Sequence, residues 1–209
     1  MIFRLDEHIW FPNPELAEED GLLAAGGDLS VERLLLAYGH GIFPWYNDDS
    51  PVLWYSPHER FVLFPEDLKI SKSMRQVLRS GRFTITMNKC FAEVMEACSS
   101  VPRKGQQGTW INPDMKVAYN RLHQKGYAHS VEVWLEGELV GGFYGVRVNN
   151  IFCGESMFSK ADNASKTALI WLCQSNLYRL IDCQLYTEHL ESMGAGMISR
   201  EEYMRWLRE

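Results

Sequence analysis

The sequence has little of what marks a secreted or membrane protein. Its first residues, "MIFRLDEHIW", contain neither the basic region nor the long apolar run of a signal peptide. The densest apolar segment, "ALIWLC" at 168–173, is far shorter than the roughly 20 residues that cross a bilayer. The five cysteines are odd in number and form no CxxC pair, so nothing indicates a disulfide framework. We therefore expect a cytoplasmic protein with no membrane partner.

Positive charge is also scarce. The net charge of −6 argues against broad, non-specific affinity for nucleic acid. One stretch, "LKISKSMRQVLRSGRF", departs from this balance, because it carries no acidic residue and five basic ones: Lys69, Lys72, Arg75, Arg79 and Arg82. Two interpretations stay open for this basic strip, a solvated helix face and a local set of phosphate contacts.

What the sequence does contain is typical of a globular protein, with 209 residues of which 46% are hydrophobic and 23% charged. Residues 1–60 are rich in turns and aromatic residues. One helix is clear there, because Ser30 can cap it and Val31, Leu34, Leu35 and Tyr38 follow a helical period. We expect a small amino-terminal subdomain over 1–60, with the boundary near Pro57, and a larger domain over 61–209.

The larger domain is predicted to hold an antiparallel meander followed by a strand–helix–strand unit. "SVEVWL", "LVGGFYGVRV" and "IFCGESMFS" form the meander, "NASKTALIWLCQSNL" the helix and "LIDCQLY" the last strand. Further helices are expected at "MRQVL", at "FAEVMEAC", after the Asn112–Pro113 cap and after the capping box of Ser199 and Glu202. The predicted fold class is α+β, with a mixed sheet of the GNAT acyltransferase type.

Glycine is missing at the place where an acyl-CoA enzyme of this fold needs it. A coenzyme A pyrophosphate is held by backbone amides in a glycine-rich turn at a helix start. The corresponding turn here, "SKADNASKTAL", contains no glycine. This absence disfavours acetyl-CoA as the acyl donor.

Ligand spacing for a metal is missing as well. Cys153, Cys183 and His189 could converge in space, but free cysteines are usually buried hydrophobic residues, and we expect no metal. A Cys153 nucleophile with His189 and Asp182 is possible, although nothing in their order along the chain supports it.

Three polar residues on apolar strands are the candidate catalytic group. Asp182 and Gln184 in "LIDCQLY" should face the same side of a strand, either as a structural pair or as part of a site. The Gln184 amide oxygen can accept a hydrogen bond from an attacking amine, and Asp182 can hold that amide in place. Glu155 interrupts "IFCGESMFS" and adds a second negative charge, so the group should prefer a cationic partner.

The motifs "GGDLS", "YGHGIFPWY", "WYSP", "GTWI", "AHSVEVW", "FCGESMFS", "NASKTAL" and "LIDCQ" resemble those of the leucyl/phenylalanyl-tRNA–protein transferases, in the same order from about residue 11 to 198. The resemblance implies transfer of leucine or phenylalanine, and less readily methionine, from tRNA to proteins that begin with Arg or Lys. The new residue would mark those proteins for degradation in bacteria, with no metal, ATP or coenzyme A required.

The same resemblance assigns roles to further residues. Trp45 and Trp110 would hold the terminal adenosine of the tRNA, since base stacking contributes roughly 1–3 kcal/mol. The amino-acid pocket would be lined by Phe143, Phe152, Met157, Leu169 and Leu172. Phe143 replaces an expected Met, and Leu172 and Asn176 replace expected Phe residues, so the preference among Leu, Phe and Met stays open.

The basic strip at 69–82 would contact the acceptor stem of the tRNA through its phosphates. Gln184 would direct the acceptor amine at the ester carbonyl, and Glu155 would hold a cation, either the donor ammonium or the acceptor side chain. Two rival functions remain, a GNAT-type N-acyltransferase with a different acyl donor and an inactive binder of charged tRNA. We expect a monomer.

Overall fold

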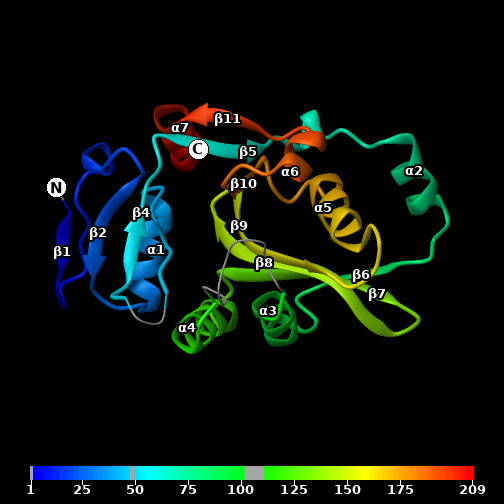
Figure 1. Cartoon of the computed structure of the whole chain (residues 1–209), viewed down its shortest axis with the longest axis horizontal. Helices are drawn as coiled ribbons and strands as arrows, with labels where there is room; N and C mark the ends of the chain where they lie inside the picture. The colour runs from blue at the N-terminus through cyan, green and yellow to red at the C-terminus, as the bar shows by residue number, and fades with distance from the viewer. Residues whose placement is uncertain (1, 48–49, 102–110) are drawn as a thin grey trace.

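Two β-sheets form the framework of the molecule (Figure 1). The computed structural model describes residues 2–47, 50–101 and 111–209. Its elements are, in chain order, β1 (Phe3–Leu5), a 3-10 turn (Pro14–Leu16), β2 (Leu22–Gly26), α1 (Val31–Gly39), β3 (Phe43–Pro44), β4 (Leu53–Tyr55), β5 (Glu59–Leu63), a second 3-10 turn (Pro65–Asp67), α2 (Lys72–Arg79), β6 (Thr84–Met87), α3 (Phe91–Ser99), α4 (Pro113–Gln124), β7 (Ala128–Leu135), β8 (Glu138–Val148), β9 (Ile151–Ser159), α5 (Ala164–Gln174), β10 (Leu180–Gln184), α6 (Glu188–Ser192), β11 (Gly196–Ser199) and α7 (Arg200–Arg208).

The amino-terminal part packs α1 on a four-stranded sheet with the order β1-β2-β4-β3. The predicted helix is confirmed, because the Ser30 hydroxyl accepts the Arg33 N–H at 3.3 Å and Leu34 and Tyr38 are buried. The sheet itself was not predicted from the sequence. Its strands span only two to five residues, too few for an alternating pattern to stand out.

The larger sheet has seven strands in the order β11-β5-β10-β9-β8-β7-β6. The predicted meander is confirmed, with β7, β8 and β9 antiparallel, and β10 lies parallel to β9 after the crossover helix α5. In Figure 1, α3 and α4 cover one face of this sheet and α5 covers the other. The predicted α+β class, a small amino-terminal subdomain on a larger mixed-sheet domain, is confirmed.

Strand β5 joins the two parts of the chain. It begins at Glu59 and pairs with both β10 and β11 in the larger sheet. The domain boundary at residue 60 stays a prediction. None of the helices in the described segments is both long and apolar enough to cross a membrane.

Candidate active site

A cavity of about 420 Å³ opens between β3, the strands β8 to β10 and α6. Four of the predicted pocket residues line it: Phe143, Phe152, Met157 and Leu169. Phe143 and Phe152 meet edge to face, with ring centroids 5.5 Å apart. Apolar surface dominates this wall, so the cavity suits an apolar side chain.

Leu172, the fifth predicted pocket residue, does not line the cavity. It lies one turn beyond Leu169 on α5, fully buried in the core, and does not reach the cavity. Apolar residues three positions apart on a helix lie on the same general face, but they need not contact the same neighbours. The sequence alone therefore could not show that Leu169 lines the cavity and Leu172 does not. Ile181 and Leu190, which the sequence analysis did not select, line the cavity.

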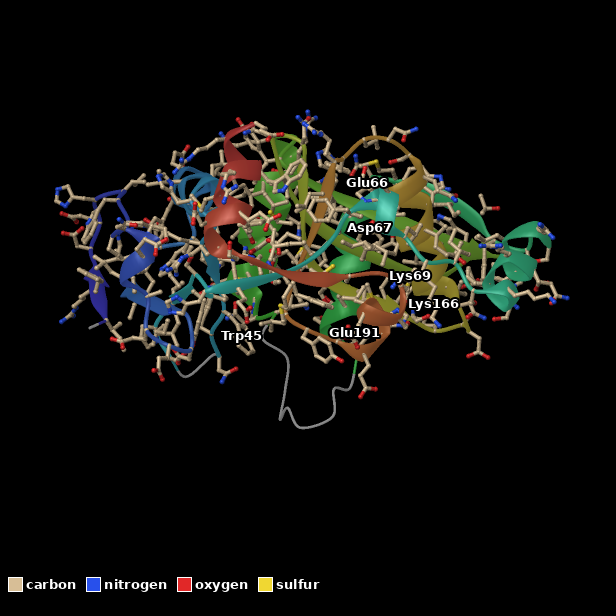
Figure 2. The ribbon with its side chains drawn as sticks, turned by 90° about the horizontal axis from the view of Figure 1, so that it is seen from above. Trp45, Glu66, Asp67, Lys69, Lys166 and Glu191 are labelled. Carbon is tan, nitrogen blue, oxygen red and sulfur yellow. The ribbon has the colours of Figure 1, made fainter. Side chains whose placement is uncertain are left out.

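Trp45 stands at the amino-terminal side of the cavity. Figure 2 shows it at the junction between the amino-terminal part and the rest of the molecule. The residue is half-buried, and its backbone N–H donates to the Leu53 carbonyl at 2.9 Å. Its ring packs against the Tyr55 ring, with the two centroids 5.8 Å apart. Phe43 and Pro44, just before it, also line the cavity. Trp110, the second predicted adenosine contact, lies outside the described residues.

Glu155 reaches the cavity through an irregularity in β9. Tyr144 pairs with Ser156 and Gly145 pairs with Gly154, so Glu155 is an extra residue with no partner across the strand. Such a bulge breaks the alternation of side chains and turns one of them to a new direction. Glu155 is 9% exposed and lines the cavity.

Three donors hold the Glu155 carboxyl. Its Oε1 accepts from the Tyr38 hydroxyl at 2.6 Å and from Gln184 Nε2 at 2.8 Å, and its Oε2 accepts from the Tyr119 hydroxyl at 3.3 Å. The two tyrosine hydroxyls also lie in hydrogen-bonding contact with each other, so their two protons are shared among three contacts. Burial raises the pKa of Glu155 to about 7, against the opposing effect of the hydrogen bonds from Tyr38 and Gln184.

Glu155 should therefore make stability depend on pH. Its folded pKa of about 7 lies above its usual value of 4.5, so the folded state holds the proton more tightly and stability is lost as pH rises through this interval. From pH 5 to pH 8 we expect the wild type to lose about 2–3 kcal/mol of unfolding free energy relative to Glu155→Gln. Urea unfolding at four pH values measures this difference. An exposed control, Glu136→Gln, should run parallel to the wild type, and a parallel Glu155→Gln curve would contradict the assignment.

Asp182 is an ion-pair partner rather than a free carboxylate. It is 0% exposed and faces Arg60, which is 2% exposed. Arg60 Nη2 lies 2.8 Å from Oδ2, and Nε lies 3.0 and 3.1 Å from the two carboxylate oxygens. The Tyr203 hydroxyl donates to Oδ2 at 2.8 Å. Burial works to lower the pKa of Arg60, but the attraction of Asp182 outweighs it and the pKa is raised.

The predicted link between Asp182 and the Gln184 amide was wrong in one respect. Asp182 Oδ1 accepts the backbone N–H of Gln184 at 2.9 Å, whereas the side-chain amide donates to Glu155. The reason is local: β10 bulges between the two residues, and Gln184 has φ of +63°, so regular alternation ends there. In the described part of the chain, Gln184 Oε1 accepts no hydrogen bond, which leaves it available to a ligand in the cavity.

The side chains of the basic strip are exposed. Lys72, Arg75 and Arg79 lie on α2, which Figure 1 places at the end of the molecule opposite β1, and Lys69 and Arg82 flank that helix. Among the described residues, no acidic side chain lies within ion-pair distance of the five. Their contact with phosphate stays a prediction.

Cys153 is not placed to act as a nucleophile. It is fully buried, and burial, with the charge of Asp182, raises the pKa of its thiol well above the usual value. His189 lines the cavity at α6. Within residues 2–47, 50–101 and 111–209, no group of three His, Cys, Asp or Glu side chains is arranged to hold a metal ion.

Sequence reasoning missed four residues of this network. Tyr38 was selected only as a member of an apolar helix face, and Tyr119, Tyr203 and Arg60 were not selected. A buried tyrosine hydroxyl usually needs a partner, so a tyrosine on each of three apolar faces was an available signal.

The family model described as "Leucyl/phenylalanyl-tRNA protein transferase" matches residues 62–208, and the model of its N-terminal domain matches residues 27–58. A leucyl/phenylalanyl-tRNA–protein transferase of Syntrophobacter fumaroxidans is 55% identical over 100% of this chain and 90% of its own length. The protein of the same name from Flavobacterium johnsoniae is 51% identical, over 99% of both chains. A solved protein of unknown function from Bacteroides thetaiotaomicron is similar in fold, with a TM-score of 0.50, 15% identity and coverage of 64% of this chain and 53% of that one.

Proposed function

The chain belongs to the leucyl/phenylalanyl-tRNA–protein transferase family, and from this premise we propose how its cavity performs the reaction. The enzyme transfers leucine or phenylalanine, and less readily methionine, from tRNA to the amino terminus of proteins that begin with Arg or Lys. The bond that forms is a peptide bond, and the bond that breaks is the ester to the tRNA ribose. The aminoacyl ester is already activated, so the protein has to position its two substrates and direct one proton.

The donor amino acid lies in the apolar part of the cavity. Phe143, Phe152 and Leu169 surround its side chain, and the terminal adenine stacks on Trp45. The half-exposed ring of Trp45 beside the cavity supports this placement, because an adenine needs an accessible aromatic face next to the ester. The basic strip on and around α2 contacts tRNA phosphates, which carry no sequence information.

Gln184 directs the acceptor. Its Nε2 donates to Glu155, so its Oε1 accepts a hydrogen bond from the acceptor α-amine and points the nitrogen lone pair at the ester carbonyl. The nitrogen attacks the carbonyl carbon, the bond to the ribose oxygen breaks, and the amine proton ends on that oxygen by way of the neighbouring 2′-hydroxyl. Holding both reactants in this geometry supplies most of the rate.

Glu155 has two roles in this arrangement. Its Oε1 fixes the orientation of the Gln184 amide. Its Oε2, which among the described residues accepts only the long bond from Tyr119, faces a cationic group of a substrate. The donor α-ammonium is the nearer candidate, because the donor side chain fills the adjoining apolar wall. That the enzyme acts as a monomer in the cytoplasm stays a prediction.

The observation that carries the proposal is the Gln184 amide oxygen, which accepts no hydrogen bond from the described residues and is held beside an apolar cavity by Glu155. The test is a transfer assay with tRNA that carries radiolabelled leucine, phenylalanine or methionine, and peptides that begin with Arg, Lys or Ala. Label is expected on the Arg and Lys peptides only. Label on the Ala peptide to the same extent would contradict the acceptor assignment. No label with any pair would redirect the search to other acyl donors, the rival function of a GNAT-type fold.

Phe143 should set the preference among donors. Its ring narrows the cavity against Phe152, and replacing it by the flexible Met would widen the slot. Because apolar pockets discriminate by about 1–3 kcal/mol per methylene-sized change, Phe143→Met should raise the ratio of phenylalanine to leucine transfer by roughly tenfold. Competition between the two charged tRNAs measures the ratio. Leu172→Met, a change in the core behind the cavity, is the matched control and should leave it unchanged.

A further inference from the structure

Arg60 joins two parts of the active site through a single guanidinium group. Its Nε and Nη2 hold Asp182, and its Nη1 donates to the Gly41 carbonyl at 2.9 Å. The group lies between two aromatic rings, 4.8 Å from the centroid of Phe43 and 4.6 Å from that of Tyr203. Every direction in which the guanidinium could move is therefore opposed by a bond or a ring.

The first part that Arg60 holds is the turn of Gln184. A φ of +63° is unfavourable for a residue with a side chain, and it persists only where the surroundings impose it. Here the imposing contact is the hydrogen bond from the Gln184 backbone N–H to Asp182 Oδ1. Arg60 fixes the other face of that carboxylate. The direction of the Gln184 amide thus depends on Arg60 through Asp182.

The second part is the segment that carries Trp45. Gly41 and Phe43, both in contact with the guanidinium, lie four and two residues before Trp45, and Phe43 lines the cavity. Since β3 spans only two residues, its own pairing with β4 constrains the segment weakly. The Arg60 contacts add the constraint that the short strand lacks.

We propose that Arg60 is a positioning residue for the transfer reaction, which sets the Gln184 amide and the Trp45 platform at a fixed distance from each other. The inference rests on the proposed function. Arg60 touches no substrate in this arrangement; it acts through Gln184 on the chemical step and through Trp45 on the binding of aminoacyl-tRNA. Arg60→Lys keeps the charge next to Asp182 but has no planar fork, so it cannot hold the carboxylate and the Gly41 carbonyl together.

The test is a double-mutant cycle between Arg60→Lys and Gln184→Ala, with kcat and KM measured in the labelled transfer assay. In the wild-type background we expect Arg60→Lys to lower kcat by roughly 10–100-fold, because displacement of a reacting group by about 1 Å can cost that much. In the Gln184→Ala background the same change should lower kcat by less than about threefold, because the amide it positions is gone. The KM for aminoacyl-tRNA should rise in both backgrounds, through Trp45.

Arg200 provides a matched control. Like Arg60, it is a buried arginine, 5% exposed. It connects α7 to the amino-terminal part by donating to Glu15 and to the Ser56 carbonyl. It contacts neither Asp182 nor the cavity. Arg200→Lys should lower the melting temperature and leave kcat and KM within about twofold of the wild type. Tyr203→Phe, which removes one donor to Asp182, should show the same non-additivity with Gln184→Ala at smaller size, and it serves if Arg60→Lys does not fold.

Two outcomes would overturn the inference while the wild type remains active. One is an equal loss of kcat from Arg60→Lys in both backgrounds, and the other is an Arg60→Lys enzyme that matches Arg200→Lys in kcat and KM. Absence of transfer by the wild type itself would instead contradict the proposed function.

Discussion

Replacing Asp182 by alanine is expected to lower the free energy of unfolding by about 3–5 kcal/mol. The change leaves the Arg60 guanidinium in the core without a counter-charge, and Arg60 is only 2% exposed, so water cannot replace the lost carboxylate. Two further donors lose their acceptor, the Tyr203 hydroxyl and the Gln184 backbone N–H. Urea unfolding at pH 7, followed by circular dichroism, measures the loss.

A second variant shows whether the loss of stability comes from the unpaired Arg60 charge or only from lost packing. Replacing both partners, as Asp182→Leu with Arg60→Met, removes the two charges together and should recover part of the stability that Asp182→Ala loses. The recovered stability should bring no transfer activity with it, because the contact that shapes the Gln184 turn is absent. A loss below about 1 kcal/mol in Asp182→Ala would mean that the pair is solvated and that the burial described above is wrong.

Replacing Gln184 by alanine is expected to slow transfer by about 10²–10³-fold, with little change in the KM for aminoacyl-tRNA. The amide oxygen is the group that we assign to the acceptor amine, while the cavity wall and Trp45, which we assign to the donor, are left intact. Steady-state transfer of labelled phenylalanine to an Arg peptide gives both constants. An activity within fivefold of the wild type would remove Gln184 from the mechanism.

Gln184→Gly separates the cost of the turn from the role of the amide. Glycine adopts a φ of +63° without strain, so this variant should be more stable than Gln184→Ala by about 1 kcal/mol and equally inactive. If the glycine variant regained activity together with stability, the effect of the alanine substitution would have come from the backbone and not from the amide.

The parts of the fold that could be predicted from the sequence are those that local contacts fix. Asn112 caps α4 by accepting the Met115 N–H at 2.9 Å, and Ser199 caps α7 by accepting the Glu202 N–H at 3.1 Å. Both caps were recognisable, because the capping residue and the residue it serves are three positions apart. The strand β5 was not, because its position in the sheet depends on pairing with β10 and β11, more than 100 residues further along the chain.

The residues of the site divide in the same way, into those that the sequence identified and those whose distant partners it could not show. Residue type identified Glu155, Asp182 and Gln184 as unusual on apolar strands, and all three line one cavity. Their partners could not be assigned, because the bulge at Glu155 and the left-handed turn at Gln184 break the alternation from which side-chain directions are inferred. Arg60, the partner of Asp182, is 122 residues away and carried no local signal.

The polar side chains that contact one another at the site come from distant parts of the sequence, and this separation has a consequence for folding. The bond from Tyr38 to Glu155 spans 117 residues, and that from Arg60 to Asp182 spans 122. Closing loops of this length is slow, so the contacts form late, after the helices and the local hairpins. We therefore expect partly folded forms of the chain to lack a working site, and a newly made chain to lack one until Gln184 has left the ribosome. Catalytic activity in a denaturant titration should therefore disappear over the same concentrations as the global structure, and activity after refolding should count fully native molecules only.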